Sequence, residues 1–237
     1  MRPFFRPLAG CILHRHGTVD VVPAIHEVGV LALPVVALVA IFVGTNVTLA
    51  GCAIFAQFGR QSDVGIFVAL AGVREMAPVA AAFMLAAKSG AAVAALIATM
   101  RLGGQITALE AMSVDPFRHL ALPRLLALAV AAPALVMAAD LLCLVTGFVV
   151  AVVQLHVEPA LYWENVRLYA TPFDIAVGAF KGLVFGIIIA ISSLLHGFAA
   201  PASPEGVGRA SNHAVVTSTV SCIVVNYLLT QLFYSGS

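Results

Sequence analysis

Charged side chains are scarce in this sequence, making up 10% of its 237 residues, whereas 62% of the residues are hydrophobic. A soluble domain carries about a quarter charged residues, so the composition indicates a polytopic membrane protein. No charged residue occurs from Val28 to Gly59 or from Ala210 to Ser237. Because about 20 apolar residues in a helix cross a bilayer, each run is long enough to span one. The net charge of +1 argues against a nucleic-acid partner, which needs a basic surface.

The sequence also lacks the spacings that mark metal and catalytic sites. Its four cysteines, at positions 11, 52, 143 and 222, form no Cys-x-x-Cys pair, so neither a disulfide framework nor a metal site is expected. His14 and His16 flank Arg15 and fit a solvated surface at the membrane interface better than a metal site. There is no Walker A, His-Glu-x-x-His or Gly-x-Ser-x-Gly motif, so we expect no catalytic residue and no cofactor in this chain.

What the sequence has in quantity is apolar helix-forming blocks, at about 29–58, 64–100, 117–155, 174–199 and 212–234. The blocks are continuous rather than alternating, which favours helices over barrel strands as the way to pair backbone groups in lipid. We predict an all-α integral membrane protein whose five transmembrane helices form one domain, residues 28–237. Residues 1–27 are predicted to form an amphipathic helix lying in the membrane interface, with a disordered tail as the alternative.

The distribution of basic residues predicts the orientation, because cytoplasmic segments carry an excess of lysine and arginine. With the N-terminus inside, only Arg60 and Arg167 fall in outer loops. The inner segments then hold seven arginines: Arg2, Arg6, Arg15, Arg101, Arg118, Arg124 and Arg209. We therefore predict an N-in/C-out arrangement.

Arg74, Glu75, Lys88 and Asp140 fall inside predicted membrane helices, as does Lys181. Arg74 and Glu75 lie about ten residues, or ~15 Å, from the outer end of the second helix, a depth near the bilayer midplane. A lone charge there costs a few kcal/mol or more, so such residues pair or line a wet cavity. Helical neighbours point about 100° apart, so these two cannot pair with each other. Cavity lining and a structural ion-pair network that includes Asp140 both stay open.

Residues of one kind recur at helical spacing on two of the predicted helices, one set apolar and the other small. Val47, Gly51, Ile54, Phe55 and Phe58 share one face of the first helix, which fits core packing or the wall of a binding site. In the second helix, a ladder of small residues allows another helix to approach closely, although alanine bias alone produces such ladders. The ladder consists of Gly90, Ala94 and Ala98.

A short polar stretch separates the second and third apolar blocks. Gly103 and Gly104 end the second helix, and Asp115-Pro116 begins the third, since Asp is a favoured N-cap and Pro fits the first helical position. Residues 105–114 (QITALEAMSV) between them predict a helix of under three turns along the inner membrane face. An isolated helix this short is only marginally stable, so we expect it to pack against another part of the protein or a partner. A plain linker is the alternative.

Two stretches, VREMAPVAAAFMLAAKSGAAVAALIATMR and QITALEAMSVDPFRHLALPR, resemble the MlaE/YrbE family of ABC-transporter permeases, and the resemblance extends over residues 25–235. The shared register is specific. It includes Arg-Glu-x-x-Pro at 74–78, Gly90, Met100-Arg101, Gln105, Glu110-x-Met112-x-Val114-Asp115-Pro116 and Pro123-Arg124.

The resemblance implies a permease subunit of the bacterial inner membrane that moves phospholipid or a related lipid between the inner and outer membranes. It implies a second permease subunit, a cytoplasmic ABC ATPase that binds ATP and Mg, a periplasmic MCE-domain protein and, in some systems, a STAS-domain subunit. Residues 103–114 correspond to the coupling helix that docks on the ATPase, with Arg101, Gln105, Glu110, Met112, Asp115 and Arg118 as contact candidates. The lipid-cavity candidates are Arg74, Glu75, Phe55, Phe58, Val47 and Ile54.

The chain departs from the family pattern at four positions. Leu96 and Gly104 stand where glutamate is usual, Lys88 where arginine is usual, and Asn226 where aspartate is common. One hypothesis is that this chain pairs with a non-identical permease that retains those acids. Two other functions remain open: an ion-coupled carrier that uses Glu75, Lys88 and Asp140 as a relay, and a membrane scaffold that transports nothing.

Overall fold

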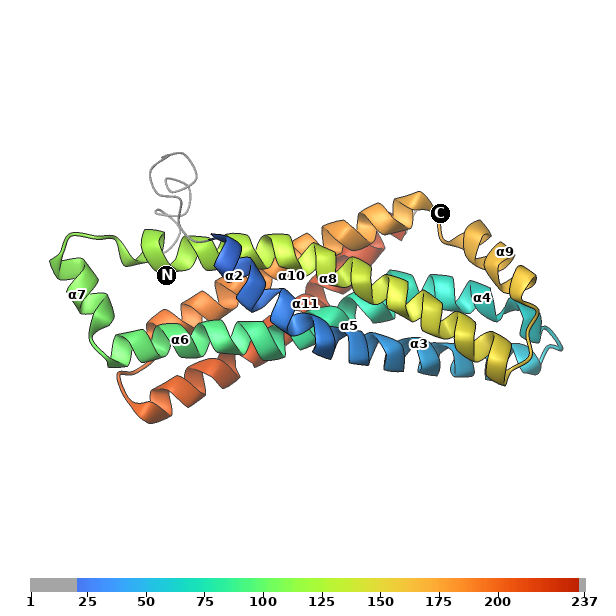
Figure 1. Ribbon diagram of the computed structural model, residues 1–237, viewed down its shortest axis with the longest axis horizontal. Helices are drawn as coiled ribbons and strands as arrows, with labels where there is room; N and C mark the ends of the chain where they lie inside the picture. Colours follow the sequence, from blue (N-terminus) through green and yellow to red (C-terminus); the bar gives the residue numbers. More distant parts are fainter. Residues whose placement is uncertain (1–20, 235–237) are drawn as a thin grey trace.

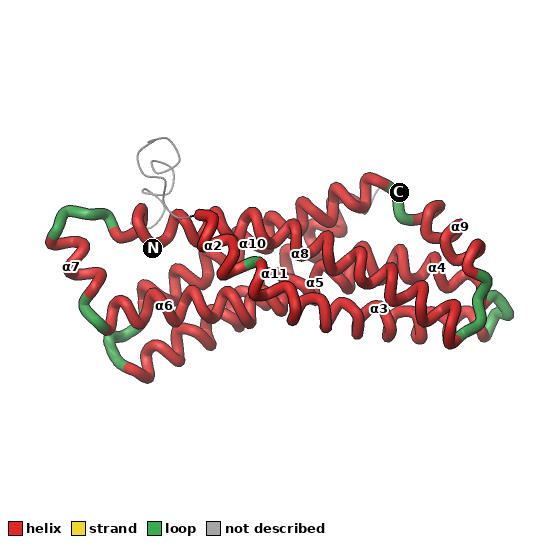
Figure 2. Tube along the Cα trace, viewed as in Figure 1, coloured by secondary structure: helices red, strands yellow, loops and turns green. Residues whose placement is uncertain are grey.

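The computed structural model describes residues 21–234 and is helical throughout, with no strand in that range. Five of its helices are long and apolar enough to cross a membrane, which confirms the predicted all-helical class and the number of spans, while the N-in/C-out orientation stays a prediction. They form one elongated bundle (Figures 1 and 2). The five spans are Pro23–Ala56, Gln61–Leu102, Phe117–Gln154, Pro172–Ala199 and Pro204–Tyr234.

The first two spans consist of several helical segments. The first contains α2 (Val21–Val28), η1 (Val30–Ala32) and α3 (Leu33–Ala56). The second begins with the short segments η2 (Gln61–Asp63) and α4 (Val64–Phe67). It continues through the π-helical η3 (Val68–Met76), α5 (Ala77–Leu85), the π-helical η4 (Ala86–Gly90) and α6 (Ala91–Leu102).

The remaining elements alternate between long spans and short connecting helices. After α7 (Gln105–Ala111), the third span comprises η5 (Phe117–Ala121), α8 (Leu122–Val149) and η6 (Val150–Gln154). A short helix, α9 (Pro159–Tyr169), precedes the last two spans, α10 (Pro172–Ala199) and α11 (Pro204–Tyr234).

The N-terminal part of the chain is described only from residue 21 onward. Helix α2 packs against α8 and lies at an angle to α3, with which it is joined through Gly29 and η1 (Figure 1). Most of the segment predicted to lie in the membrane interface, residues 1–20, lies outside the described residues. The interfacial helix therefore stays a prediction.

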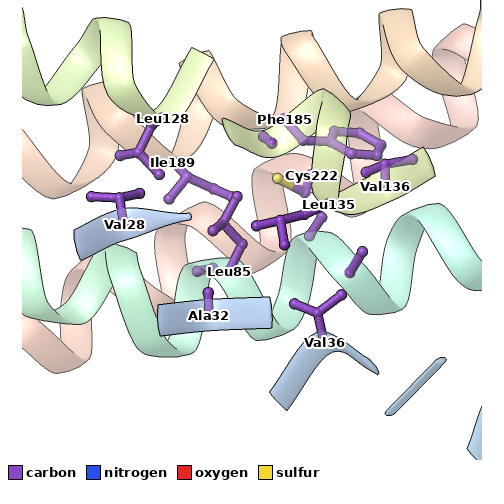
Figure 3. Close-up of a cluster of buried hydrophobic side chains, with 14 of the residues drawn as sticks. Val28, Ala32, Val36, Leu85, Leu128, Leu135, Val136, Phe185, Ile189 and Cys222 are labelled. Atoms are coloured by element: carbon purple, nitrogen blue, oxygen red, sulfur yellow. The ribbon is translucent and has the colours of Figure 1, made fainter. Parts of the chain in front are cut away.

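The centre of the bundle is built by apolar side chains from α3, α5, α8 and α10. Figure 3 shows Leu85, Leu128, Leu135, Phe185 and Ile189 converging there, and all five are buried. These side chains are closely packed against neighbouring helices, so a larger side chain at any of these positions would not fit without a shift of the helices. This core fixes the positions of α10 and α11, which carry several of the polar groups described below.

Glycines let α10 approach α8 closely. A Cβ atom added at Gly186 would lie 2.5 Å from the carbonyl oxygen of Leu128, and one added at Gly182 would lie 2.8 Å from the Cα of Pro133. Small residues allow such backbone contact between membrane helices, where lipid removes the hydrophobic driving force for association. The predicted ladder at the end of η4 and in α6 has a similar role, because Ala94 and Ala98 are fully buried and Gly90 faces Ile189 of α10.

The short helices mark the two ends of the bundle. Helix α7 lies at the same end as the start of α2 and the connection between α10 and α11, whereas α9 and the C-terminal end of α11 lie at the other (Figure 1). Because five spans connect them, the start of the first span and the end of the last one lie toward opposite ends of the molecule (Figure 1). Helices α3, α4 and α8 extend beyond the start of α10 toward α9 (Figure 1).

Candidate functional site: a polar network inside the bundle

Arg74 of η3 is paired across the bundle with the first turn of α10. Its Nε lies 2.9 Å from Oδ1 of Asp174, and its Nη2 donates to Oδ2 of Asp174 at 3.2 Å and to the carbonyl oxygen of Tyr169 at 3.1 Å. The guanidinium also sits 4.6 Å from the ring centroid of Tyr234. A planar guanidinium suits this set of partners, since it offers a donor fork to the carboxylate and a flat face to the ring.

Asp174 joins three elements at one point. Its Oδ2 accepts hydrogen bonds from the backbone N–H and the hydroxyl of Thr171 at 2.8 and 2.9 Å, forming a capping box at the start of α10. Its Oδ1 accepts from the Tyr234 hydroxyl at 2.6 Å, and the side chain is almost fully buried. A carboxylate at a helix N-terminus is favoured by the helix dipole, so the same group caps α10 and compensates Arg74.

Glu75, the neighbour of Arg74, belongs to a second group of contacts. Its Oε1 lies 3.2 Å from Nζ of Lys181 and accepts from the Thr230 hydroxyl at 2.5 Å, while its Oε2 accepts from the Asn226 amide at 2.7 Å. Lys181 is 1% exposed, whereas the side chain of Glu75 is 35% exposed. The charge pair is therefore buried on its cationic side and partly open on its anionic side.

Lys181 also compensates a break in the helix that carries Arg74. Pro78 has no N–H, so the carbonyl oxygen of Arg74, four residues earlier, loses its usual helical donor. Lys181 Nζ donates to that oxygen at 2.8 Å, and to the Thr230 hydroxyl at 2.8 Å. The break coincides with the π-helical stretch η3, a type of irregularity that is frequent at functional sites.

Asp140 of α8 lies against α10, the helix that carries Lys181. Its side chain is buried, its Oδ1 has no hydrogen-bond partner among residues 21–234, and Lys181 is the cation that acts on it. Gly178 of α10 makes room for it, since a Cβ there would lie 3.1 Å from Oδ2 of Asp140. A buried, unsatisfied carboxylate oxygen in an apolar bundle is unusual and calls for a functional or structural explanation.

The charged residues predicted inside the membrane lie in or near this network, except for Lys88, which lies on the surface. Arg74 and Glu75 have the cross-bundle partners that their location required, and Asp140 lies near them through Lys181. Lys88 does not join them: it is exposed on η4 and has no ion-pair partner in the described part of the chain. The partner of Arg74 is Asp174 in the first turn of α10, and not Asp140 of the third span.

The predicted apolar face of α3 is split between core and surface. Val47 is buried and packs near Gly72 of η3, and Gly51 packs against Phe67. Phe55 is half-buried, while Ile54 and Phe58 are exposed, Phe58 by 73%. The outer half of this face therefore offers apolar surface at the α9 end of the bundle, where α10 and α11 stop short (Figure 1).

At the other end, the polar stretch forms the expected short helix, α7, between two loops. Gln105, Glu110 and Met112 are exposed, and Gly104 adopts the left-handed conformation with a φ of 70° that ends the second span. Asp115 is exposed too, and its Oδ1 accepts from the backbone N–H of Phe117 at 2.9 Å, which confirms the predicted N-cap.

Two arginines flank this stretch. Arg101 is exposed and donates to the carbonyl oxygen of Phe198 in α10, while Arg118 is half-buried in η5. Phe117 stacks on Phe198 with ring centroids 4.6 Å apart, so the start of the third span is attached to the end of α10. Leu96, a position where the family pattern has an acid, lines a cavity of about 300 Å³ between α2, α6 and the start of the third span.

Several residues of the network escaped the sequence interpretation. The sequence places Lys181 within a membrane helix without identifying a partner for it, and no sequence pattern singles out Asp174, Thr230 or Tyr234. The charge of Lys181 within an apolar run predicts that it has a polar or acidic partner, but the sequence does not identify that partner. No group of three or more His, Cys, Asp or Glu side chains within residues 21–234 is placed to hold a metal ion.

The model of the family described as Permease MlaE matches residues 21–232 of this chain. The chain belongs to the MlaE permease family. It is 38% identical over 207 residues to a probable ABC transporter permease protein of Rickettsia conorii, an alignment that covers 87% of this chain and 80% of that protein. A probable ABC transporter permease protein of Synechocystis is 30% identical over 225 residues, covering 95% and 84% of the two chains.

A more distant MlaE-family relative has a name that includes a substrate. The intermembrane phospholipid transport system permease protein MlaE of Haemophilus influenzae is 27% identical over 216 residues, covering 91% of this chain and 83% of that protein. Together with the five apolar helices, these matches confirm the resemblance seen in the sequence. The chain is a multi-pass membrane permease of the ABC-transporter type.

Proposed function

We propose that this MlaE-family permease moves phospholipid or a related lipid between the inner and outer membranes of a bacterium, from a position in the inner membrane. The main support is the polar network around Glu75. A charge pair whose cation is buried and whose carboxylate is 35% exposed offers a polar contact point inside an apolar bundle. Lipid headgroups need such polar contacts beside apolar surface, and Ile54 and Phe58 supply exposed apolar surface on α3.

The energy for transport comes, in this proposal, from a separate cytoplasmic ABC ATPase that binds ATP and Mg, and the permease chain itself holds no cofactor. Helix α7 is the element proposed to dock on that ATPase. It is short and exposed, and together with its flanks it presents the candidates Arg101, Gln105, Glu110, Met112, Asp115 and Arg118. Its exposed Met112 and Glu110 provide apolar and charged contacts for a partner groove.

The other proposed partners are a second permease subunit, a periplasmic MCE-domain protein and a STAS-domain subunit on the ATPase. The wide apolar surface of the single chain, which includes Phe42, Leu141 and Leu232, is available for lipid and for a second permease. The ion-coupled relay gains no support, because Lys181 rather than Lys88 pairs with Glu75.

A transport assay on the native complex tests this function. The complex, purified with its own partner chains and reconstituted in liposomes, is expected to transfer labelled phospholipid to acceptor membranes in an ATP-dependent manner. Glu75→Gln is expected to slow transfer by about tenfold, since a charge-assisted hydrogen bond is worth ~1.5–3 kcal/mol and 1.4 kcal/mol corresponds to tenfold.

The matched control is Glu164→Gln, which removes an exposed carboxylate on α9 and should leave transfer unchanged. A complex that hydrolyses ATP but transfers no lipid would contradict the proposed substrate class. Equal transfer rates for Glu75→Gln and the native protein would contradict the role of the network.

A further inference from the structure

A second cluster of polar side chains lies at the end of α10 and α11 that is remote from Asp174 and Tyr234. There, an open cavity of about 210 Å³ is lined by the last turn of α10, the connection after it and the first turns of α11. Its polar lining consists of His196, Arg209 and His213, and the other lining residues are alanine, glycine and proline. The small residues leave the space between the three cationic or titratable side chains open.

The three side chains face the cavity together. The rings of His196 and His213 are stacked with centroids 5.9 Å apart and an interplanar angle of 26°. Nε2 of His196 lies 3.0 Å from the Thr217 hydroxyl, which orients the ring. Arg209 is exposed and stands four residues before His213, hence on the same face of α11.

The charge of this cavity is of one sign. No carboxylate lines it, and Glu205, one turn before Arg209 on α11, forms no ion pair with it in the described chain. Arg101 of the adjacent α6 adds a further positive charge at this end of the bundle, where it donates to Phe198. Two stacked imidazoles beside a guanidinium repel one another when protonated, and a bound anion offsets that repulsion.

The cavity also lies at a defined level along α11. The 21 residues from Ala214 to Tyr234 span about 31 Å as a helix, which matches the ~30 Å hydrocarbon core of a bilayer. His213 and Arg209 therefore lie just beyond one boundary of that core when Tyr234 is at the other. This is the level of lipid headgroups, where cationic side chains attract anionic phosphates.

We propose that His196, Arg209 and His213 form a binding site for a phosphate group, supplied by the headgroup of an anionic phospholipid or by free phosphate. Imidazolium and guanidinium donors form short charge-assisted hydrogen bonds to phosphate oxygens. The site is separate from the Arg74–Glu75 network, and its existence does not depend on which substrate the permease transports.

Histidine side-chain NMR tests the proposal on the full-length permease. The protein, labelled with 15N in histidine, is placed in phosphatidylcholine nanodiscs, and two probes are added separately: phosphatidate in the bilayer, and millimolar inorganic phosphate in the buffer. The imidazole signals of His196 and His213, assigned from His196→Gln and His213→Gln, are expected to move toward the protonated form. Arg209→Gln is expected to weaken the apparent affinity about tenfold, the loss of one charge-assisted contact.

The control is Arg167→Gln, which removes an exposed arginine on α9 at the opposite end and should leave the affinity unchanged. A response to phosphatidate alone identifies the lipid headgroup as the source, and a response to inorganic phosphate identifies free phosphate; either supports the site. Signals that respond to neither probe would overturn the proposal, as would a response that Arg209→Gln leaves intact.

Discussion

At the scale of single residues, Lys181 has the most demanding position in the described chain. It is buried to 99% in an apolar bundle, its ammonium is held by three oxygens from η3 and α11, and its charge also acts on Asp140. An ammonium there is tolerated only because the acceptors and the opposite charges are supplied by other helices. Lys181 thus connects α8, α10, α11 and the irregular second span.

Replacing Lys181 tests how much this connection contributes. Lys181→Met removes the cation but keeps most of the side-chain volume, leaving Glu75 and Asp140 without compensation. Breaking a buried pair costs about 3 kcal/mol or more, so we expect Tm to fall by about 6–12 °C in a thermal unfolding assay of the purified protein. Lys88→Met, at an exposed position, should change Tm by about 1 °C or less. Equal Tm values for both variants would contradict a structural contribution from Lys181.

At the scale of elements, close helix contact depends on the absence of side chains at a few positions. Gly186→Ala places a methyl group 2.5 Å from a backbone oxygen of α8, so the two helices must separate. Overpacking of this kind costs about 1–3 kcal/mol, which predicts a lower Tm and a smaller folded fraction on gel filtration. Gly208→Ala is the control, since nothing lies within 4 Å of the added atom, and alanine raises helix propensity by ~1 kcal/mol. A destabilised Gly208→Ala variant would show that the reasoning from contact distance is wrong.

Helix α7 carries a functional prediction at the same scale. Glu110→Lys reverses an exposed charge, so folding of the membrane part should be preserved while stimulation of the partner ATPase by the permease falls by at least about tenfold. The measurement compares ATPase rates of the reconstituted native complex with either permease. Glu164→Lys, an equal charge reversal on α9, is expected to leave the rate unchanged. Full stimulation by Glu110→Lys would exclude Glu110 from coupling.

These elements differ in how far the sequence predicts them. The five spans, the short helix α7 and the Asp115 cap follow from local rules: length of apolar runs, glycine punctuation and capping chemistry. The need of Arg74 and Glu75 for partners follows from the cost of burying charge. The identity of those partners does not follow, because Asp174 and Lys181 are about 100 residues away and their register against η3 depends on the packing of α10. The π-helical form of η3 does not follow either, since the hydrogen bond from Lys181 to the Arg74 carbonyl oxygen comes from a distant part of the chain.

At the scale of the whole molecule, the two ends of the bundle differ in chemistry. One end carries α7, Arg101 and the His196–Arg209–His213 cavity, and the other carries α9, Asp174 and the C-terminal end of α11 (Figure 1). If the first end faces the cytoplasm, its basic residues lie on the side that membrane proteins favour for arginine, and α7 is within reach of an ATPase. The proposed coupling, in which α7 transmits motion of the ATPase to the polar network near α10, requires this orientation.

Cysteine labelling of cells tests that orientation directly. In a variant without native cysteines, Ala111→Cys on α7 and Glu164→Cys on α9 are both exposed positions at opposite ends of the bundle. With N-in/C-out topology, a membrane-impermeant maleimide should label residue 164 from the outside of spheroplasts and residue 111 only after permeabilisation. The reverse pattern would place α7 away from any cytoplasmic ATPase. Because both sites lie on one chain with five spans, an inverted result would refute the coupling proposal while leaving the family and the fold intact.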